Sequence, residues 1–403
     1  MKIGILTFHR SINFGAFMQC FSLLTRLKKD FSDCVFEVVD FTPKTVINSY
    51  SNIIEQAKTE ELRRQYTERA QAFQKVYSYL NLSPQRLETD NYNDIADYLN
   101  QHYDAVIVGS DAVWNWITRG FPNVYFLKDY HGIKFSYAAS AHGLLYKNMT
   151  QEQSSYLEKA FNDFRYIGVR DVTTENMVHY VLPEKKVYHN CDPTVFLNLD
   201  DVPCDMSILR NKMEKHGVDF SKPLVGIMAG ASIGREIKKK YGNKIQLVAV
   251  YEYNPYADVY LYDLTPFEWA HVFSLFKLTL THFFHGTMLS LKNGTPVIPI
   301  ETLNSFSAVY TTKISDLLNR LELTEWREEI NHLSCNKLQR GLYRFGLKTD
   351  KDLWERVFDR MNLFLENDYS EIIFNKLNQE AKCYDSFHEA LRAYIHEQDT
   401  DIK

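Results

Sequence analysis

The stretch T-L-T-H-F-F-H-G-T-M-L-S-L-K-N-G-T-P-V-I-P-I, from Thr279 to Ile300, predicts a strand, a tight turn, a short helix and a second strand. An apolar, β-favouring run is broken at His285-Gly286-Thr287. Gly294 stands where a glycine commonly ends a helix. Pro296 to Ile300 then resumes the pattern of a buried strand. This order is typical of one step in a parallel α/β sheet.

The turn at His285 predicts an anion pocket. A helix that starts directly after a strand leaves backbone N–H groups unpaired, and these attract anions. Gly286 would let the backbone approach a ligand closely, and Thr287 would add a hydroxyl and an amide. His285 could supply a proton or a positive charge there, as a general acid. A hydrogen-bonded structural histidine is the alternative.

Composition limits the class of protein. The chain has 403 residues, which favours two domains over one. A formal net charge of -5 argues against a nucleic-acid binder held by a basic face. Aromatic residues make up 14% of the chain, which suits sugar-stacking clefts as well as a core.

The six cysteines and the chain's apolar runs bear on location and metals. No two cysteines are spaced as in a C-x-x-C motif, so we expect buried thiols in a reducing compartment. The N-terminal apolar run is too short for a signal peptide, and no run is long enough to span a membrane. We therefore expect a cytoplasmic protein with no metal site and no cofactor.

The N-terminal region opens as a βαβ unit. Ile3 to Phe8 predicts a buried strand, a turn with Asn13 and Gly15 follows, and Val35 to Phe41 predicts the next strand after a helix. The turn lacks the glycine pattern of dinucleotide binding and the lysine of a phosphate-binding loop. Asn13 and Gly15 are candidates for contact with a substrate, since parallel sheets bind ligands at the carboxyl ends of their strands.

A second candidate site follows the predicted central strand, Ala105 to Val108. Ser110, Asp111, Trp114 and Asn115 come directly after it, at the ligand edge of the sheet. Asp111 could act as a general base, and Trp114 could stack on a sugar ring. The alternative is that Asp111 caps a helix and Trp114 belongs to the core.

A second α/β unit begins with the strand Leu224 to Met228. A charged stretch from Asn198 to about Lys222 separates it from the first unit. We expect domains at 1–200 and 201–345, with a helical segment at 346–403. The charged stretch from about Ile53 to Leu80 predicts a solvated helix pair.

Six motifs together resemble the polysaccharide pyruvyl transferase family. They are I-N-F-G-A-F-M-Q at 12–19, V-I-V-G-S-D-A-V-W-N at 106–115, F-S-Y-A-A-S at 135–140, I-G-V-R-D at 167–171, C-D-P-T at 191–194 and F-F-H-G-T at 283–287. They occur in the family's order over roughly the first 320 residues. The second and the last of them make the resemblance specific.

The resemblance implies a fold and a reaction. The fold is α/β, with two Rossmann-like domains facing across a cleft as in GT-B glycosyltransferases and with C-terminal helices. The reaction transfers pyruvate from phosphoenolpyruvate, a co-substrate, to a sugar of a glycan precursor, usually as a cyclic ketal. The acceptor could be free or lipid-linked.

Residue roles follow from that chemistry. His285 would protonate the donor methylene, and Asp111 would accept a proton from a sugar hydroxyl. Arg170, Arg235, Gly286 and Thr287 would hold the anionic donor. Asn13, Gly15, Ser110, Trp114 and Asn115 would bind the acceptor, and no metal would take part.

One position departs from the family pattern. Many relatives carry serine or arginine two residues before the F-H-G-T histidine, where this chain has Phe283. The departure leaves two alternatives open. One is a glycosyltransferase that uses a nucleotide-sugar, with Glu301 holding a ribose, and the other is a non-catalytic relative.

Overall fold

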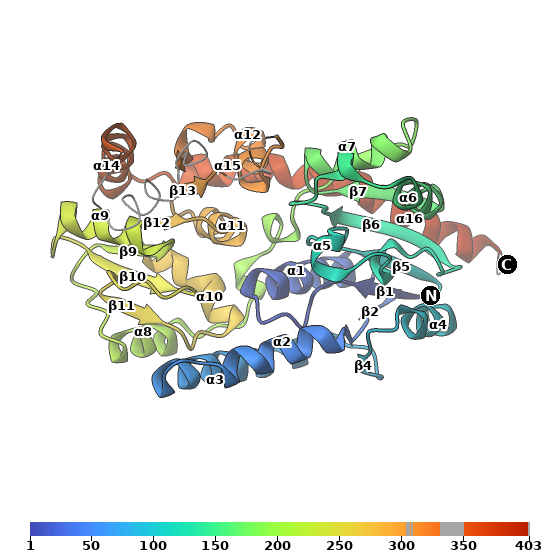
Figure 1. Ribbon diagram of the computed structural model, residues 1–403, viewed down its shortest axis with the longest axis horizontal. Coiled ribbons are helices and arrows are strands. Elements are labelled where there is room, and N and C mark those ends of the chain that lie inside the picture. Colours follow the sequence, from blue (N-terminus) through green and yellow to red (C-terminus); the bar gives the residue numbers. More distant parts are fainter. Residues whose placement is uncertain (304–306, 308, 331–349, 402–403) are drawn as a thin grey trace. The chain divides into compact units, whose positions relative to one another are not determined.

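The computed structural model describes residues 1–303, 307, 309–330 and 350–401, and it divides into two compact units (Figure 1). The first unit comprises Met1–Arg63, Lys75–Leu197 and Glu380–Lys403, and the second comprises Arg64–Gln74 and Asn198–Gln379. Each unit has its own parallel sheet with helices packed around it (Figure 1).

The first unit is built on six parallel strands in the order β2-β1-β5-β6-β7-β8. The strands are β1 (Lys2–Leu6), β2 (Val35–Val38), β5 (Ala105–Val108), β6 (Ile133–Ala139), β7 (Phe164–Val169) and β8 (Val187–His189). A separate parallel pair consists of β3 (Phe41–Thr42) and β4 (Leu87–Glu88). The predicted central strand is confirmed: β5 is buried throughout and pairs with β1 and β6.

Helices connect these strands as in βαβ units. They are α1 (Phe14–Asp30), α2 (Lys44–Glu55), α4 (Tyr92–His102), α5 (Trp116–Arg119), α6 (Gln151–Asn162) and α7 (Val172–Val181). Helix α3 (Glu60–Gln74) belongs to the second unit from Arg64 on, and α16 (Asp385–Asp401) follows the last described strand and belongs to the first unit. Short 3-10 turns lie at η1 (Tyr77–Tyr79), η2 (Val124–Phe126), η3 (Tyr146–Asn148), η4 (Pro193–Val195) and η8 (Ala381–Tyr384), while η5 (Leu199–Asp201) belongs to the second unit.

The second unit repeats this plan, with six parallel strands in the order β11-β10-β9-β12-β13-β14. They are β9 (Leu224–Met228), β10 (Gln246–Val250), β11 (Val259–Leu261), β12 (Leu278–Thr281), β13 (Val297–Thr302) and β14 (Glu328–Ile330). Its helices are α8 (Met206–Lys215), α9 (Ala231–Tyr241), α10 (Pro266–Val272), α11 (Phe284–Lys292), α12 (Lys313–Arg320), α14 (Lys351–Glu366) and α15 (Ser370–Glu380), with 3-10 turns η6 (Phe273–Leu275) and η7 (Thr324–Trp326).

Local sequence signals explain where these elements begin and end. Thr265 and Glu268 form the capping box at the start of α10, with Pro266 at its first position. At the end of α11, Gly294 has φ +70 and its N–H donates to the carbonyl of Leu291. The strand-turn-helix-strand prediction for residues 279–300 is confirmed by β12, α11 and β13.

The C-terminal helices correct one expectation. The segment 346–403 does not form a separate part, because its described residues are divided between the two units. In the second unit, Arg360 of α14 donates to Glu328 of β14 at 3.1 Å. In the first unit, Phe387 of α16 packs edge-on against Tyr137 of β6. Each helix thus completes the unit it covers.

Helices α2 and α3 confirm the predicted solvated helix pair: α2 has no buried residue, and α3 buries Ala72 and Phe73 alone. Residues 64–74 cluster with the second unit. Arg69 donates to the carbonyl oxygen of Tyr251 at 2.6 Å and to the hydroxyl of Tyr260 at 2.5 Å. The charge pattern alone did not show that one arginine of this helix faces a tyrosine pair.

Candidate active site

In the first unit, polar residues follow the carboxyl ends of the central strands. Ser110 and Asp111 follow β5, Arg170 follows β7, and Asp192 follows β8. These side chains come from three segments of the chain, and the parallel sheet brings their starting points to one edge. Asp111, which was predicted to be catalytic, and Arg170, which was predicted to bind the donor, therefore belong to one cluster.

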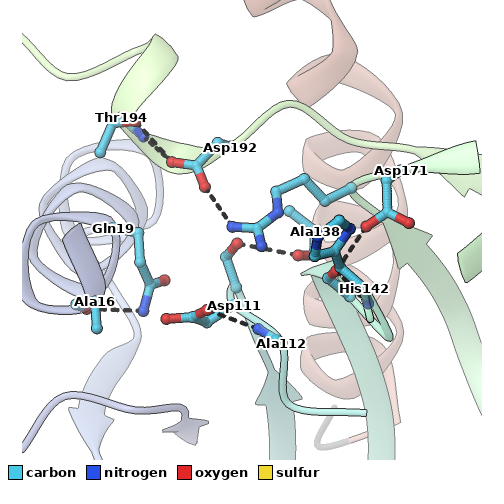
Figure 2. Close-up of polar contacts among 12 residues, drawn as sticks. Ala16, Gln19, Asp111, Ala112, Ala138, His142, Asp171, Asp192 and Thr194 are labelled. Carbon is cyan, nitrogen blue, oxygen red and sulfur yellow. Dashed lines mark hydrogen bonds and ion pairs between the residues drawn. The ribbon is translucent and has the colours of Figure 1, made fainter. Parts of the chain in front are cut away.

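Arg170 is the centre of this cluster. Its side chain is 1% exposed, and its Nη1 donates to the Oδ2 of Asp192 at 2.8 Å (Figure 2). Burial alone would lower the pKa of Arg170, but the charges of Asp192, Asp111 and Asp171 outweigh it and hold that pKa above its ordinary value. Arg170 is thus a permanent buried cation. With carboxylates already around it, it is better suited to orienting Asp111 and Asp192 than to binding an anionic donor.

Asp111 has an uncommon backbone conformation. Its φ is +95, a region that residues with side chains rarely adopt outside functional sites and special turns. Its Oδ1 accepts the N–H of Ala112 at 2.7 Å, and its carbonyl accepts the N–H of Ser140. Asp111 does not cap a helix, because α5 begins later and is capped by Asn115. Its carboxylate is partly exposed and could accept a proton.

Gln19 is a member of this edge that sequence reasoning missed. It is fully buried in α1, and its amide nitrogen donates to Thr7 Oγ1 at 3.0 Å and to the carbonyl of Ala16 at 2.9 Å. Its Oε1 is buried with no hydrogen-bond partner among the described residues. The signal was present, since Gln19 ends the I-N-F-G-A-F-M-Q motif and is a polar residue on an apolar helix face.

The predicted acceptor-binding residues differ in burial and in what they contact. Asn13 is the exposed cap of α1 and accepts the N–H of Ala16, while Gly15 is buried in that helix's first turn. Asn115 caps α5 and donates to the carbonyl of His142. Trp114 is fully buried, and its indole N–H donates to the carbonyl of Tyr125. The structure therefore favours the core interpretation of Trp114.

Ser110 is held inside the same edge. It is fully buried, and its hydroxyl donates to the carbonyl of Ala138 at 3.0 Å. The carbonyl of Ser110 accepts the hydroxyl of Thr7 at 2.6 Å. Both contacts fix the segment that carries Asp111.

In the second unit, α11 begins at Phe284, so His285 lies in the first turn of the helix rather than in a turn before it. Phe283 is its N-cap and makes no side-chain capping bond, and the first intrahelical bond runs from the N–H of Thr287 to the carbonyl of Phe283. The first-turn N–H groups of Phe284, His285 and Gly286 precede that bond and point toward the helix N-terminus. His285 is half-buried at the second helical position, next to these donors.

Gly286 and Thr287 have structural reasons for their identity. A Cβ at Gly286 would lie 2.2 Å from Cε of Met228 and 2.7 Å from Oγ1 of Thr281. The glycine therefore lets α11 pack closely on the sheet, and this close approach is to protein rather than to a ligand. Thr287 is fully buried, and its hydroxyl donates to the carbonyl of Phe283 at 3.1 Å.

Arg235 lies in the second turn of α9, one turn later than the helix start expected for it. Its side chain is 21% exposed, and its Nε lies 3.3 Å from Oε1 of Glu236. The arginine retains partial contact with solvent. Its position in the helix still leaves it a candidate for binding an anion.

The apolar run before His285 predicts that the strand includes Phe283, and the structure shows that this is wrong. Strand β12 ends at Thr281, so side-chain alternation along a strand does not orient Phe283. Instead its ring packs edge-on against Tyr251 at 5.2 Å and lies 4.2 Å from the ring of His282. His282 Nε2 lies 3.4 Å from Oε2 of Glu252. Sequence reasoning did not place Tyr251 or Glu252, which follow β10, in this neighbourhood.

Burial affects the pKa of His282 more strongly than the neighbouring carboxylate of Glu252 does. Burial lowers the pKa of His282, and the nearby carboxylate of Glu252 offsets this only in part. His282 is therefore mainly neutral near pH 7 and can donate or accept a hydrogen bond there.

Two features of the residues that the structure describes are a group of possible metal ligands and the apolar length of the helices. One group of three, His189, Glu380 and Cys383, has potential ligand atoms within 4.8 Å of one another. His189 Nε2 lies 3.7 Å from Oε1 of Glu380, which fits an ion pair. Over the same residues, no helix combines the length and the apolar character needed to cross a bilayer.

Comparison with solved structures bears on the fold. The fold resembles sugar-modifying enzymes of the GT-B type with two Rossmann-like domains. UDP-GlcNAc 2-epimerase from Neisseria meningitidis, solved with UDP-GlcNAc bound, shares 12% identity and a TM-score of 0.53, covering 98% of this chain and 100% of that chain. At so low an identity, this similarity concerns the fold alone.

Two further structures are more distant. UDP-GlcNAc 2-epimerase from Methanocaldococcus jannaschii has 10% identity and a TM-score of 0.49, covering 92% of this chain and 94% of that one. E. coli ADP-heptose LPS heptosyltransferase II has 10% identity and a TM-score of 0.42, covering 91% and 98%. A search among curated proteins gave no match.

The family is settled by sequence. A family model described as polysaccharide pyruvyl transferase matches residues 13–304, most of the chain. The chain belongs to this family of transferases, as the six motifs indicated.

Proposed function

We propose that this protein transfers pyruvate from phosphoenolpyruvate to a sugar of a polysaccharide or glycan precursor and forms a ketal. The observation that carries the proposal is the position of His285 at the start of α11, where the N-cap residue makes no side-chain bond to the helix. Anions bind well at such helix starts. An acid placed beside the bound anion is what protonation of an enol phosphate requires.

The second unit is proposed to bind the donor. Its phosphate and carboxylate would accept hydrogen bonds from the first-turn N–H groups of α11, and Arg235 would add a positive charge. Since Phe283 occupies a position that is polar in many relatives, donor affinity depends here on the helix start more than on an arginine at that position.

The first unit is proposed to bind the acceptor, with Asp111 as the general base. Asn13, Gly15, Ser110 and Asn115 lie at its ligand edge or shape that edge. The charge of Arg170 interacts with the carboxylate of Asp111, so Arg170 would act through that carboxylate rather than on the donor. The buried Oε1 of Gln19 could accept a hydrogen bond from an acceptor hydroxyl.

The proposed chemistry balances without a metal or an oxidant. His285 gives a proton to the methylene carbon of phosphoenolpyruvate, and the neighbouring carbon becomes cationic. One sugar hydroxyl bonds to that carbon and loses its proton to Asp111. A second hydroxyl then bonds to the same carbon and displaces phosphate. The proton of this hydroxyl passes to His285, and Asp111 gives its proton to the departing phosphate, so that a ketal and inorganic phosphate result and both side chains return to their starting states.

Nucleotide-sugar transfer is the competing function, and one residue weighs against it. Glu301, the candidate ribose ligand, accepts the Nε of Arg327 at 2.6 Å and the hydroxyl of Thr312 at 2.9 Å. A carboxylate engaged in this way is less available to a ribose. The precedent for a bound UDP-sugar comes from distant structures that share the fold, such as the Neisseria meningitidis epimerase at 12% identity.

Calorimetric titration distinguishes the two donors. We expect phosphoenolpyruvate to bind the purified protein, and UDP and UDP-GlcNAc to bind much more weakly. A binding constant for UDP that exceeds the one for phosphoenolpyruvate would favour the nucleotide-sugar function instead.

A further inference from the structure

The first unit contains a second recess, separate from the Arg170 cluster. It has a volume of about 470 Å³, within the range of small-molecule sites of about 300–1,000 Å³. It is formed by the start of α2, the segment before α4 and the segment between α5 and η2. We call it the aromatic pocket, after Phe41, Tyr92, Phe121 and Tyr125 in its wall.

The aromatic wall is held in place by packing. Tyr125 lies edge-on to Phe8 at 5.1 Å and is tilted against Phe41 at 6.1 Å. Phe121 packs edge-on against Trp116 at 5.4 Å and against Tyr156 at 5.0 Å. Rings held in this way need little ordering when a ligand binds, which favours affinity.

One carboxylate in the wall is oriented by two hydrogen bonds. Asp90 Oδ1 accepts the N–H of Thr45 at 3.2 Å and its hydroxyl at 3.0 Å. Within the described residues, Oδ2 receives no hydrogen bond, so it remains an acceptor for a ligand. A fixed carboxylate beside aromatic rings suits a ligand with hydroxyl donors and apolar C–H faces.

The wall also excludes one class of ligand. No lysine or arginine lies among the described residues that line the aromatic pocket. An anion such as phosphoenolpyruvate would meet the negative charge of Asp90 without a compensating cation. The chemistry of the wall therefore favours a neutral, hydroxyl-rich ligand.

We propose that the aromatic pocket binds a pyranose ring of the acceptor glycan. The inference rests on the proposed function, because it assigns to the first unit a subsite for the sugar chain that receives the pyruvyl group. The partly exposed rings of Tyr92 and Phe121 pack on the C–H face of the sugar, and Asp90 accepts its hydroxyls. This subsite binds sugar at a position where no residue was predicted from sequence.

Saturation-transfer NMR on the purified full-length protein tests the pocket directly. The probes are the methyl glycosides of glucose, galactose, mannose and N-acetylglucosamine, and uridine serves as the competing aromatic ligand. We expect at least one glycoside to bind, and uridine not to bind. Binding of uridine alone, or of none of the glycosides, contradicts the proposal.

Two matched pairs of variants locate the binding. Val46→Trp fills the pocket from α2, whereas Ile53→Trp places the same ring on the exposed face of that helix. Asp90→Asn removes the charge of the wall, whereas Asp97→Asn removes an exposed charge on α4. We expect at least about tenfold weaker glycoside binding in Val46→Trp and Asp90→Asn, and unchanged binding in both controls.

The outcomes separate this inference from the proposed function. The pocket assignment is wrong if Val46→Trp and Asp90→Asn have the melting temperature of the wild type and still bind glycosides as tightly as the wild type does. Phosphoenolpyruvate binding is measured by calorimetry on the same samples. If glycoside binding depends on the pocket but the protein does not bind phosphoenolpyruvate, the sugar subsite stands and the proposed donor is wrong.

Discussion

Arg170 and Asp192 form an ion pair at 2.8 Å with both side chains almost wholly buried. A buried pair contributes less to stability than its short distance suggests, because both charges lose their hydration. Removing one partner is costly, since the other charge is left behind. The pair therefore fixes the ends of β7 and β8, and through the charge of Arg170 it also acts on Asp111.

Replacing Arg170 tests whether it positions other residues or binds the donor. We expect Arg170→Gln to lower the free energy of unfolding by about 3–5 kcal/mol, because Asp192 loses its partner. Arg170→Lys keeps the charge and loses the planar fork, so a smaller loss is expected. Chemical denaturation measures both.

The donor affinity of Arg170→Lys then decides the role. Calorimetry should give a dissociation constant for phosphoenolpyruvate close to that of the wild type, while turnover falls. A large loss of donor affinity in a stably folded Arg170→Lys would mean that the arginine contacts the donor after all.

Asp40 predicts how stability changes in acid. Burial would raise the pKa of Asp40, but hydrogen bonds from Arg10 and His9 outweigh it and hold that pKa well below its ordinary value of 3.8. The folded state thus favours the charged carboxylate. The stabilisation is complete above about pH 4 and is lost as the pH falls through the lower, folded pKa.

Asp40→Asn should remove this dependence. At pH 7 we expect its free energy of unfolding to be lower by up to about 3 kcal/mol, because Arg10 and His9 lose their partner. Between pH 4 and pH 2 its stability should change less than that of the wild type. Asp97→Asn is the control, and equal acid sensitivity in the wild type and Asp40→Asn would contradict the assignment.

Gly230 is the N-cap of α9, and Gly286 lies in the first turn of α11. Replacing each of them by alanine tests the packing of the two helices without a ligand. A Cβ at Gly286 would collide with Met228 and Thr281, whereas a Cβ at Gly230 would have no neighbour within 4 Å. We expect Gly286→Ala to cost about 1–3 kcal/mol, and Gly230→Ala to cost less than about 1 kcal/mol. Thermal or chemical unfolding of both variants measures the difference, and equal costs would show that α11 does not pack as closely as described.

The fold could be predicted from sequence to a large extent, because its signals are local. Apolar runs marked β5 and β9 at their observed bounds, and the capping box at Thr265 marked the start of α10. The unit to which each C-terminal helix belongs could not be predicted from the sequence. An amphipathic helix shows that it has a buried face, but not which sheet covers that face.

The candidate site was only partly predictable, for a related reason. Positions at strand ends, such as Asp111 and His285, follow from the order of elements. Which side chains pair is decided by tertiary packing: nothing in the spacing showed that Arg170 pairs with Asp192, or that Gly286 faces Met228. Phe283 was assigned to a strand because β12 ends two residues earlier than its apolar pattern suggests.

Phe283 offers a gain-of-function test of the donor site. It is half-buried as the N-cap of α11, two residues before His285. An arginine there would add a cation beside the first-turn N–H groups, so we expect Phe283→Arg to bind phosphoenolpyruvate more tightly. Phe283→Leu controls for loss of the ring contact with Tyr251. Unchanged or weaker binding in a folded Phe283→Arg would show that this position does not contribute to the donor site.

The central claim is that the protein moves pyruvate from phosphoenolpyruvate to a glycan with His285 as the acid. The direct measurement uses phosphoenolpyruvate labelled with ¹³C and the glycan fraction of cells that produce the protein, followed by NMR. The wild type should give a labelled ketal in the glycan and one inorganic phosphate for each pyruvyl group transferred. His285→Gln should fold normally and turn over about 10²–10⁴-fold more slowly, with a smaller change in donor binding. No labelled ketal from the wild type, or wild-type turnover by His285→Gln, would contradict the claim.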